Sequence, residues 1–179
     1  MQLESDYIDL FKETSTAIKD VIAIAGDNVW NMNHYRQVAF DVHNQTKSII
    51  YAWTDFMDYG YNTTEVLIDK HVDELAEQVW KSAEKIRLFF GADAKIGRLM
   101  LARLPAGCKI GKHADSANLT YIHRCHHVIQ TNDKVDFKIG NGVYNFTEGS
   151  VFDFNNMEMH SVDNRGETDR IHLICDIKV

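Results

Sequence analysis

The feature that most constrains the fold of this 179-residue chain is a run of short segments, after Gly91, in which apolar and polar residues alternate. Such alternation is the pattern of a β-strand with one buried face. Turn-forming residues separate the segments, among them Pro105-Ala106-Gly107 and the hairpin signal Asn141-Gly142. The expected strands are residues 96–104, 119–130, 135–139, 143–146, 150–154, 158–163 and 170–177. Short strands in succession, with no helix between them, predict a mainly β fold: an antiparallel sandwich or small barrel whose mouth can hold one small ligand.

The first half of the chain carries helical signals instead. Across residues 5–25 the apolar residues recur at spacings of three and four, and Ser5 is a candidate N-cap. A clearer stripe with the same period runs from Val72 to Ile86 and ends at Gly91. Between these helices, alternation predicts two paired strands, one over residues 38–42 and one over residues 49–53. We therefore expect a single domain over residues 1–179, in which helices and extra strands of residues 1–95 support a barrel core of residues 96–179.

Composition narrows the class of function. The chain has 19 Lys and Arg against 26 Asp and Glu, a net charge of -7, and no long basic run, which disfavours nucleic acid as a partner. The first residues lack a signal-peptide pattern, and no stretch of about 18 apolar residues predicts a membrane span. Three dispersed cysteines are too few for a zinc ribbon or a disulfide framework. We expect a cytoplasmic protein with reduced thiols, and the sequence leaves its oligomeric state open.

The residues that point to chemistry begin with His113 and Asp115. One residue separates them, so on an extended segment both side chains project from the same face. His160 lies in a later strand candidate and could reach the same point across the barrel. Two imidazoles and one carboxylate on one side of a metal, with the other positions open, form the facial triad of non-haem iron(II) oxygenases. The alternative is that these are separate surface or core residues, because a His-x-Asp triplet also occurs by chance.

Basic residues near this set could bind an anion. Arg170 follows His160 by ten positions, at the start of the last expected strand, where a guanidinium could point into the barrel and bind a carboxylate through two hydrogen bonds. Its alternative role is an ordinary exposed ion pair. Arg124 and His126 share one face of their strand, and alternation puts His127 on the opposite face, where we expect a structural role.

These residues lie within a longer series of motifs: residues 99–115, ending Gly111-Lys-His113-Ala-Asp115; Arg124-Cys-His126; Glu148-Gly-Ser-Val-Phe-Asp-Phe-Asn-Asn; His160-Ser-Val-Asp-Asn; and Arg170-Ile-His-Leu-Ile-Cys-Asp176. In this order the motifs resemble those of the aspartyl/asparaginyl β-hydroxylase family of 2-oxoglutarate oxygenases. The resemblance runs from roughly Arg36 to the C-terminus and is most specific after Gly97.

The resemblance implies a double-stranded β-helix, also called a jelly roll, of cupin-like form with flanking N-terminal helices. It implies that His113, Asp115 and His160 hold Fe(II) and that Arg170 holds the distal carboxylate of the cosubstrate 2-oxoglutarate. Arg124 and His126 would lie near the other end of 2-oxoglutarate or near the substrate. With O2 as co-reactant, the expected activity is hydroxylation of a C–H bond in an amino acid or an amino-acid residue of a peptide, most nearly as in an aspartyl/asparaginyl β-hydroxylase.

Three other functions fit parts of the same pattern. A proline-type hydroxylase of free amino acids would use the same residues. A non-catalytic, cupin-like module could bind a small ligand, although two inward arginines are more than an inert pocket requires. A zinc or manganese enzyme such as an isomerase could also use this barrel. Metal content, an optical band of an Fe(II)·2-oxoglutarate chelate and succinate formation distinguish these functions.

Overall fold

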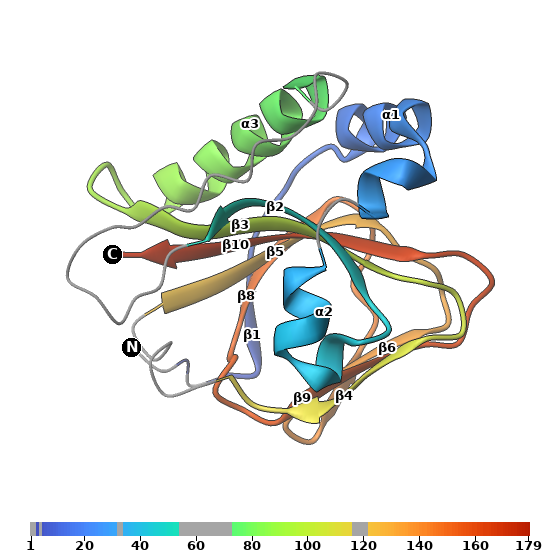
Figure 1. Cartoon of the computed structure of the whole chain (residues 1–179). Coiled ribbons are helices and arrows are strands. Elements are labelled where there is room, and N and C mark those ends of the chain that lie inside the picture. Colours follow the sequence, from blue (N-terminus) through green and yellow to red (C-terminus); the bar gives the residue numbers. More distant parts are fainter. Residues whose placement is uncertain (1–2, 4, 32–33, 54–72, 116–121) are drawn as a thin grey trace.

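A computed structural model describes residues 3, 5–31, 34–53, 73–115 and 122–179 of the chain. Strands predominate in the second half, and helices occur only before residue 90 in the described ranges (Figure 1). The elements are β1 (Tyr7–Lys12), α1 (Thr16–Ala25), the 3-10 helix η1 (Asp27–Asn31), α2 (Tyr35–Ala39), the 3-10 helix η2 (Asp41–His43), β2 (Lys47–Trp53), α3 (Asp73–Phe89), β3 (Lys95–Leu104), β4 (Lys109–His113), β5 (Ile122–Gln130), β6 (Val135–Ile139), β7 (Gly142–Tyr144), β8 (Ser150–Phe154), β9 (His160–Asn164) and β10 (Arg170–Lys178).

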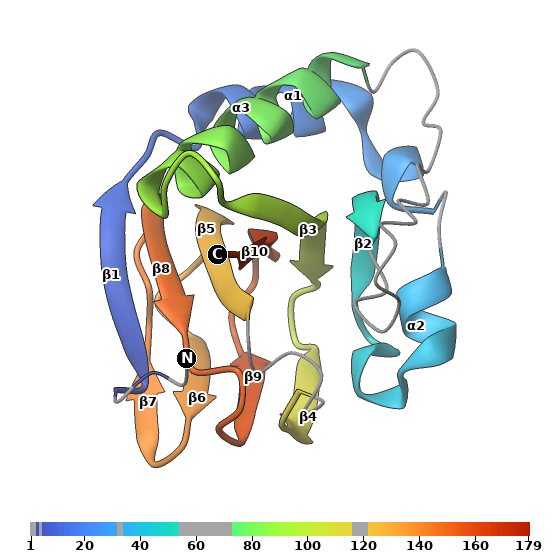
Figure 2. The same cartoon turned by 90° about the vertical axis from the view of Figure 1, so that its left-hand side faces the viewer.

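The strands form two antiparallel sheets, as expected for a jelly roll. The larger has the order β1-β8-β5-β10-β3-β2, and the smaller has the order β4-β9-β6-β7. Helices α1 and α3 lie together over the outer face of the larger sheet, as Figures 1 and 2 show from two sides. The smaller sheet lies on the side of the larger sheet that is away from α1 and α3 (Figure 2). Its residues and the inner face of the larger sheet enclose a second core.

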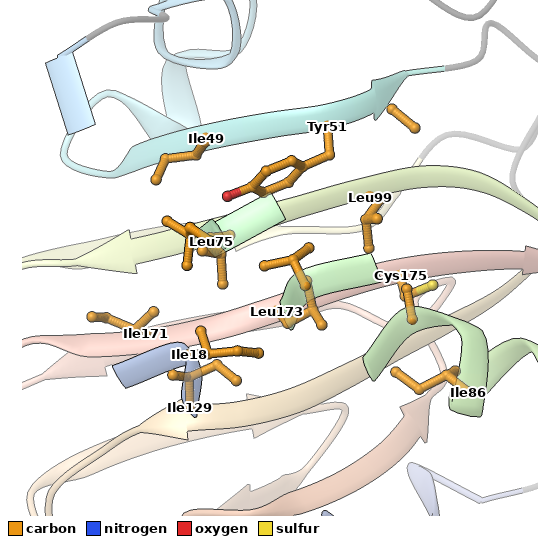
Figure 3. Close-up of a cluster of buried hydrophobic side chains, with 14 of the residues drawn as sticks. Ile18, Ile49, Tyr51, Leu75, Ile86, Leu99, Ile129, Ile171, Leu173 and Cys175 are labelled. Atoms are coloured by element: carbon orange, nitrogen blue, oxygen red, sulfur yellow. The ribbon is translucent and has the colours of Figure 1, made fainter. Parts of the chain in front are cut away.

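The outer core joins the larger sheet to the helices. Apolar side chains from α1, α3 and the sheet meet there and are almost completely excluded from solvent. Figure 3 shows Leu75 and Ile86 of α3 in one cluster with Leu99 of β3 and Leu173 of β10. This burial supplies much of the hydrophobic stabilisation of the fold, because the free energy gained scales with the apolar area removed from water.

The inner core has a different composition. Phe137, Phe146, Phe152 and Phe154 pack together between the sheets, with the rings of Phe146 and Phe152 stacked at 3.7 Å. Polar side chains on the same inner faces are also buried, and several are charged. Strands β5 and β10 are therefore covered on both sides, with mostly apolar residues toward the helices and polar residues mixed with apolar ones toward the barrel interior.

Most of the predicted elements are present. The helix predicted from the stripe that ends at Ile86 is α3, although Val72 lies outside the described residues. All seven predicted strands occur with small shifts at their ends, and residues 119–121 of the longest also lie outside the described ranges. The predicted hairpin joins β6 to β7, but its turn is Gly140-Asn141, one residue earlier than expected. Gly140 takes the positive φ of 56° there, and Gly142 pairs with Ile139.

The helix expected over residues 5–25 is wrong in its first half. Residues Tyr7–Lys12 form strand β1 at the edge of the larger sheet, paired with β8, and the helix begins only at Thr16 after Ser15. The register of β1 shifts between Asp9 and Phe11. Such a bulge adds a residue and breaks the period of two, so the apolar spacing there imitates a helix.

The strand expected over residues 38–42 is also wrong. These residues form the end of α2, the 3-10 helix η2 and their junction, and β2 pairs with β3 instead. Val38 is 81% exposed and Phe40 is 43% exposed, so their alternation does not mark a buried face. Strand β4, which was not predicted, pairs with β9 and contacts η2.

In the described part of the chain, no helix combines the length and the apolar character needed to span a bilayer.

Candidate metal centre

Two histidines of the smaller sheet form the base of the site. His113 ends β4, His160 begins β9, and the two are direct register partners with ring centroids 4.2 Å apart. Asp115 follows β4, where its backbone N–H donates to the carbonyl of Asn156 at 3.0 Å. One ligating atom of each of the three side chains lies within 4.8 Å of the other two. His160 thus reaches His113 from the neighbouring strand and not from across the barrel.

Hydrogen bonds to the backbone fix which nitrogen of each imidazole is free. His113 Nδ1 lies 2.8 Å from the carbonyl oxygen of Gly111, and His160 Nδ1 lies 2.9 Å from that of Glu158. A carbonyl can only accept, so each Nδ1 carries the proton and each Nε2 carries a lone pair. Burial lowers the pKa of His160 to about 4, against the opposing influence of Asp115. At neutral pH His160 therefore offers a metal the uncharged form that coordination requires.

An ion-pair network holds the carboxylate of the set. Arg124 donates to Asp115 and makes a two-point contact with Asp176, from Nε to Oδ1 at 2.8 Å and from Nη2 to Oδ2 at 2.6 Å. Burial raises the pKa of Asp115, but Arg124 and the nearby imidazoles lower it, and the net pKa lies below its usual value. Asp115 is therefore ionised at neutral pH. Arg124 keeps two N–H donors that these three hydrogen bonds do not use.

Arg170 lies deeper and lacks a carboxylate partner. It is 2% exposed, and its Nη2 donates to His172 Nδ1 at 2.8 Å. His126 Nδ1 lies 3.1 Å from the same nitrogen, and the Arg170 guanidinium lies 5.6 Å from the Phe137 ring centroid. Burial, with the nearby charge of Arg36, lowers the pKa of Arg170 to about 9. No acidic side chain within the described ranges neutralises it, and its Nε has no partner there. A buried cation in this state favours binding of an anion.

All six site residues predicted from the sequence line one cavity, the inner cavity: His113, Asp115, His160, Arg124, His126 and Arg170. An adjoining cavity of about 350 Å³, the outer cavity, shares His113, Asp115 and Arg124 with it. His127 lies on the opposite face of β5, where its Nδ1 is 2.9 Å from Ser82 Oγ of α3, and it lines neither cavity.

Sequence reasoning missed four residues of the site. His172 and Asp176 share the inward face of β10 with Arg170, and strand alternation could have identified both. Arg36 and His43 come from α2 and η2 and line both cavities. No local pattern marks them, because the short helices that carry them reach the barrel only through tertiary packing.

The donor set narrows the chemistry of the site. Two imidazole nitrogens and one carboxylate suit a first-row transition metal and leave coordination positions open for other ligands. A buried, unpaired guanidinium in the same cavity suits a carboxylate, which it can bind through two parallel hydrogen bonds. The site can therefore hold a metal ion and an acidic small molecule close together.

The model of the aspartyl/asparaginyl beta-hydroxylase family matches residues 13–179. The chain belongs to this family. Membership places it among the hydroxylases, which are enzymes of the oxygenase class, and confirms the resemblance noted in the sequence. No curated protein matches the chain significantly.

Solved structures share the fold at low sequence identity. An oxidoreductase of the 2OG-Fe(II) oxygenase family from Burkholderia pseudomallei matches with a TM-score of 0.55 and 16% identity, over 74% of this chain and 66% of that one. A non-heme monooxygenase described as the ThoJ-Ni complex matches with a TM-score of 0.55 and 11% identity, over 97% of this chain and 74% of that one. A viral collagen prolyl hydroxylase from Paramecium Bursaria Chlorella virus-1, in its 2OG complex, matches with a TM-score of 0.52 and 10% identity, over 98% and 97%. The chain thus spans slightly less than two thirds of the first of these proteins.

Proposed function

We propose that this protein is an Fe(II)- and 2-oxoglutarate-dependent dioxygenase that hydroxylates a C–H bond of an amino acid or an amino-acid residue. The observation that carries the proposal is the occurrence, in one cavity, of a two-histidine, one-carboxylate donor set and a buried arginine without an acidic partner. The donor set fits Fe(II), and the arginine fits the distal carboxylate of 2-oxoglutarate. Membership in the hydroxylase family supports both assignments.

The predicted site residues have distinct tasks in this proposal. His113, Asp115 and His160 would hold the iron, with both histidines bound through Nε2. Arg170 would bind 2-oxoglutarate. Arg124 would orient Asp115 and use its remaining N–H donors toward the proximal end of 2-oxoglutarate or toward the substrate.

Two neighbours of Arg170 complete the cosubstrate end of the site. His172 accepts from Arg170 and fixes the direction of the guanidinium, and His126 in turn contacts His172. His126 also lines the cavity that holds Arg170 and the metal donors, so it would lie near 2-oxoglutarate or the substrate. Both imidazoles have pKa values well below the usual range because of burial and the charge of Arg170. They are therefore neutral at physiological pH.

When bound, iron with 2-oxoglutarate and O2 would supply the oxidant, as 2-oxoglutarate is converted to succinate and CO2 and one oxygen atom enters the substrate. The protein would position the reactants and exclude water from them. Phe137, Phe154 and Val162 line the inner cavity and restrict water beside the donor set. Such exclusion matters because a reactive oxidant without its substrate would attack the protein itself.

The test begins with anaerobic protein loaded with Fe(II) and titrated with 2-oxoglutarate. We expect a visible absorption band of the iron chelate that saturates at one equivalent per chain, followed by succinate formation when O2 is admitted. A chelate band without succinate would indicate a binding module. Zinc or manganese retained through purification, with no chelate band after iron loading, would indicate a different metalloenzyme.

The substrate is identified by a second measurement. Free amino acids and short peptides are screened for stimulation of succinate formation above the substrate-free rate. We expect stimulation by one chemical class, with hydroxylated product in proportion to succinate. Stimulation by free amino acids only would favour the proline-type alternative, and stimulation by aspartyl or asparaginyl peptides would favour the family's named activity.

A further inference from the structure

Arg36 of α2 is a second buried arginine without an acidic partner. It is 8% exposed, and its contacts are to neutral groups: Nη2 lies 3.1 Å from His43 Nε2, and Nη1 lies 3.5 Å from Thr46 Oγ1. No carboxylate among the described residues forms an ion pair with it. By contrast, Arg124 pairs with two aspartates. A guanidinium withdrawn from water without a counter-charge is costly unless an anion binds there.

His43 fixes Arg36 beside the metal donors. A guanidinium can only donate, so His43 Nε2 is the acceptor and the imidazole is neutral. The pKa of His43 lies at about 2, because of burial and the charge of Arg36, so the ring stays neutral at any physiological pH. Its ring lies edge-on to that of His113, with centroids 5.3 Å apart. Arg36 is thereby held one ring away from a residue of the proposed metal site.

The charges around the cavities favour one more anion than the cosubstrate supplies. Arg36 and Arg170 are buried and Arg124 is half-buried, and the aspartates that face these arginines among the described residues are half-buried Asp115 and buried Asp176. The charges of a divalent cation and of dianionic 2-oxoglutarate cancel each other. Among these three arginines and two aspartates of the described residues, one positive charge then remains uncompensated. With Arg170 assigned to 2-oxoglutarate, Arg36 is the guanidinium left without an anion.

The outer cavity shows what else the ligand must contain. Arg36 and His43 line it together with apolar side chains, and the guanidinium of Arg98, a further cation of its wall, lies 4.4 Å from the Trp53 ring centroid. Its only acidic lining residue within the described ranges is Asp115, which Arg124 already holds. About 350 Å³ is the volume of a small-molecule site. The apolar part of the wall consists of Phe40, Val42, Trp53, Met100, Ala114 and Ile174.

We propose that Arg36 binds a carboxylate of the hydroxylation substrate and holds its compact apolar body in the outer cavity, next to His113. The proposal rests on the proposed function and specifies the substrate class, a small carboxylate. The carboxylate can be the α-carboxylate of a free amino acid or the side chain of an aspartyl residue. In either form, Arg36 selects the anion against its neutral amide, because an amide cannot neutralise the guanidinium.

The experiment uses pairs of probes that differ only in this charge. Free L-amino acids with apolar side chains are compared with their carboxamides, and blocked Asp-containing tripeptides are compared with the Asn-containing ones, by succinate formation and by calorimetric binding. We expect the parent protein to prefer the carboxylate in one of the two series. Arg36→Met should raise the KM for that carboxylate about ten- to a hundredfold and abolish its preference over the amide. Arg36→Lys should restore part of the preference.

Two controls separate this proposal from general damage and from failure of the proposed function. Arg36→Met should keep the anaerobic 2-oxoglutarate midpoint of the parent, because Arg170 and not Arg36 binds the cosubstrate. Arg165→Met, which removes an exposed partner of Asp136 and lines neither cavity, should leave all readouts unchanged. The same carboxylate preference in Arg36→Met, or no preference in the parent for any carboxylate, would overturn the proposal. Absence of the chelate band in the parent would instead contradict the proposed function.

Discussion

The two faces of β10 differ in chemistry although their residues alternate along one strand. Leu173 and Cys175 face the helices in an apolar core. Arg170, His172 and Asp176 face the barrel interior, where each has a polar partner. All five are buried, so burial alone does not separate the residues that stabilise the fold from those that form the site. The presence of polar groups on a doubly covered strand is the informative difference, because such groups require partners or ligands.

The largest difference between the two sides of the sheet is expected when a candidate metal donor that faces the barrel interior is removed. We expect His160→Ala to lose iron and turnover, because two remaining donors hold a metal far more weakly. The loss should exceed the roughly 10- to 100-fold typical of removing an outer partner of a ligand. Metal analysis of the purified variant and a succinate assay measure it. His127→Ala, on the helix side of β5, is the matched control and should keep iron; stoichiometric iron in the His160 variant would refute the assignment.

On the outer face, the expected effect is on stability. Leu173→Ala leaves a cavity in the apolar core, and such truncations cost about 2–5 kcal/mol of unfolding free energy. Urea denaturation of the metal-free protein measures the loss. The folded variant should bind Fe(II) and 2-oxoglutarate like the parent. A loss of cosubstrate affinity at unchanged folding would show that the two faces are not independent.

Arg170→Lys tests the inner face of the same strand. Lysine keeps the charge but lacks the planar pair of donors, so 2-oxoglutarate affinity should fall by the equivalent of about 1.5–3 kcal/mol, or roughly ten- to a hundredfold. Iron binding should stay at the parent level. The midpoint of the chelate absorbance against 2-oxoglutarate at constant iron provides the measurement. An unchanged midpoint would indicate that another arginine binds the distal carboxylate of 2-oxoglutarate, and Arg124 is the first to examine.

The smallest expected effect concerns pH and His127. Burial lowers the pKa of His127 from 6.5 to about 4. Between these values the unfolded chain binds more protons than the folded one, so this histidine's contribution to stability is present above pH 6.5 and is lost as pH falls toward 4. His127→Gln cannot titrate and should reduce the slope of unfolding free energy against pH by up to about 1.4 kcal/mol per unit in this window. Urea denaturation at pH 7.5 and 5 tests this; identical slopes in parent and variant would contradict it.

The strands and the proximity of the candidate metal donors could be predicted because their signals are local. In β5 and β10, alternation separates the two faces directly, and the inward side of each strand carries basic residues or histidines. His113 and Asp115 lie two residues apart, so one short extended segment places both. His160 was recognised by its motif, but its position opposite His113 depends on the pairing of β4 with β9, and β4 itself was not predicted.

The errors arise where a local pattern competes with tertiary contacts. Because of the bulge in β1, the apolar residues of this edge strand have the spacing expected of a helix. Val38 and Phe40 are exposed at the end of a helix, but they alternate with polar residues as in a strand. The second error also concealed Arg36 and His43, because a strand at residues 38–42 suggested no approach to the barrel. Their role follows from the contact of η2 with β4, which joins residues about 70 positions apart in the sequence.

The pairing of β4 has a consequence for local dynamics. In the described part of the chain, β4 is an edge strand with β9 as its strand partner, whereas β9 lies between β4 and β6. An edge strand can detach without disrupting the rest of its sheet, so β4 should open at lower free energy than β9. A metal ion held by both His113 and His160 would favour the closed form and would therefore raise the free energy of that opening. Amide hydrogens of Lys109–His113 should accordingly gain more protection from exchange on metal loading than those of His160–Asn164.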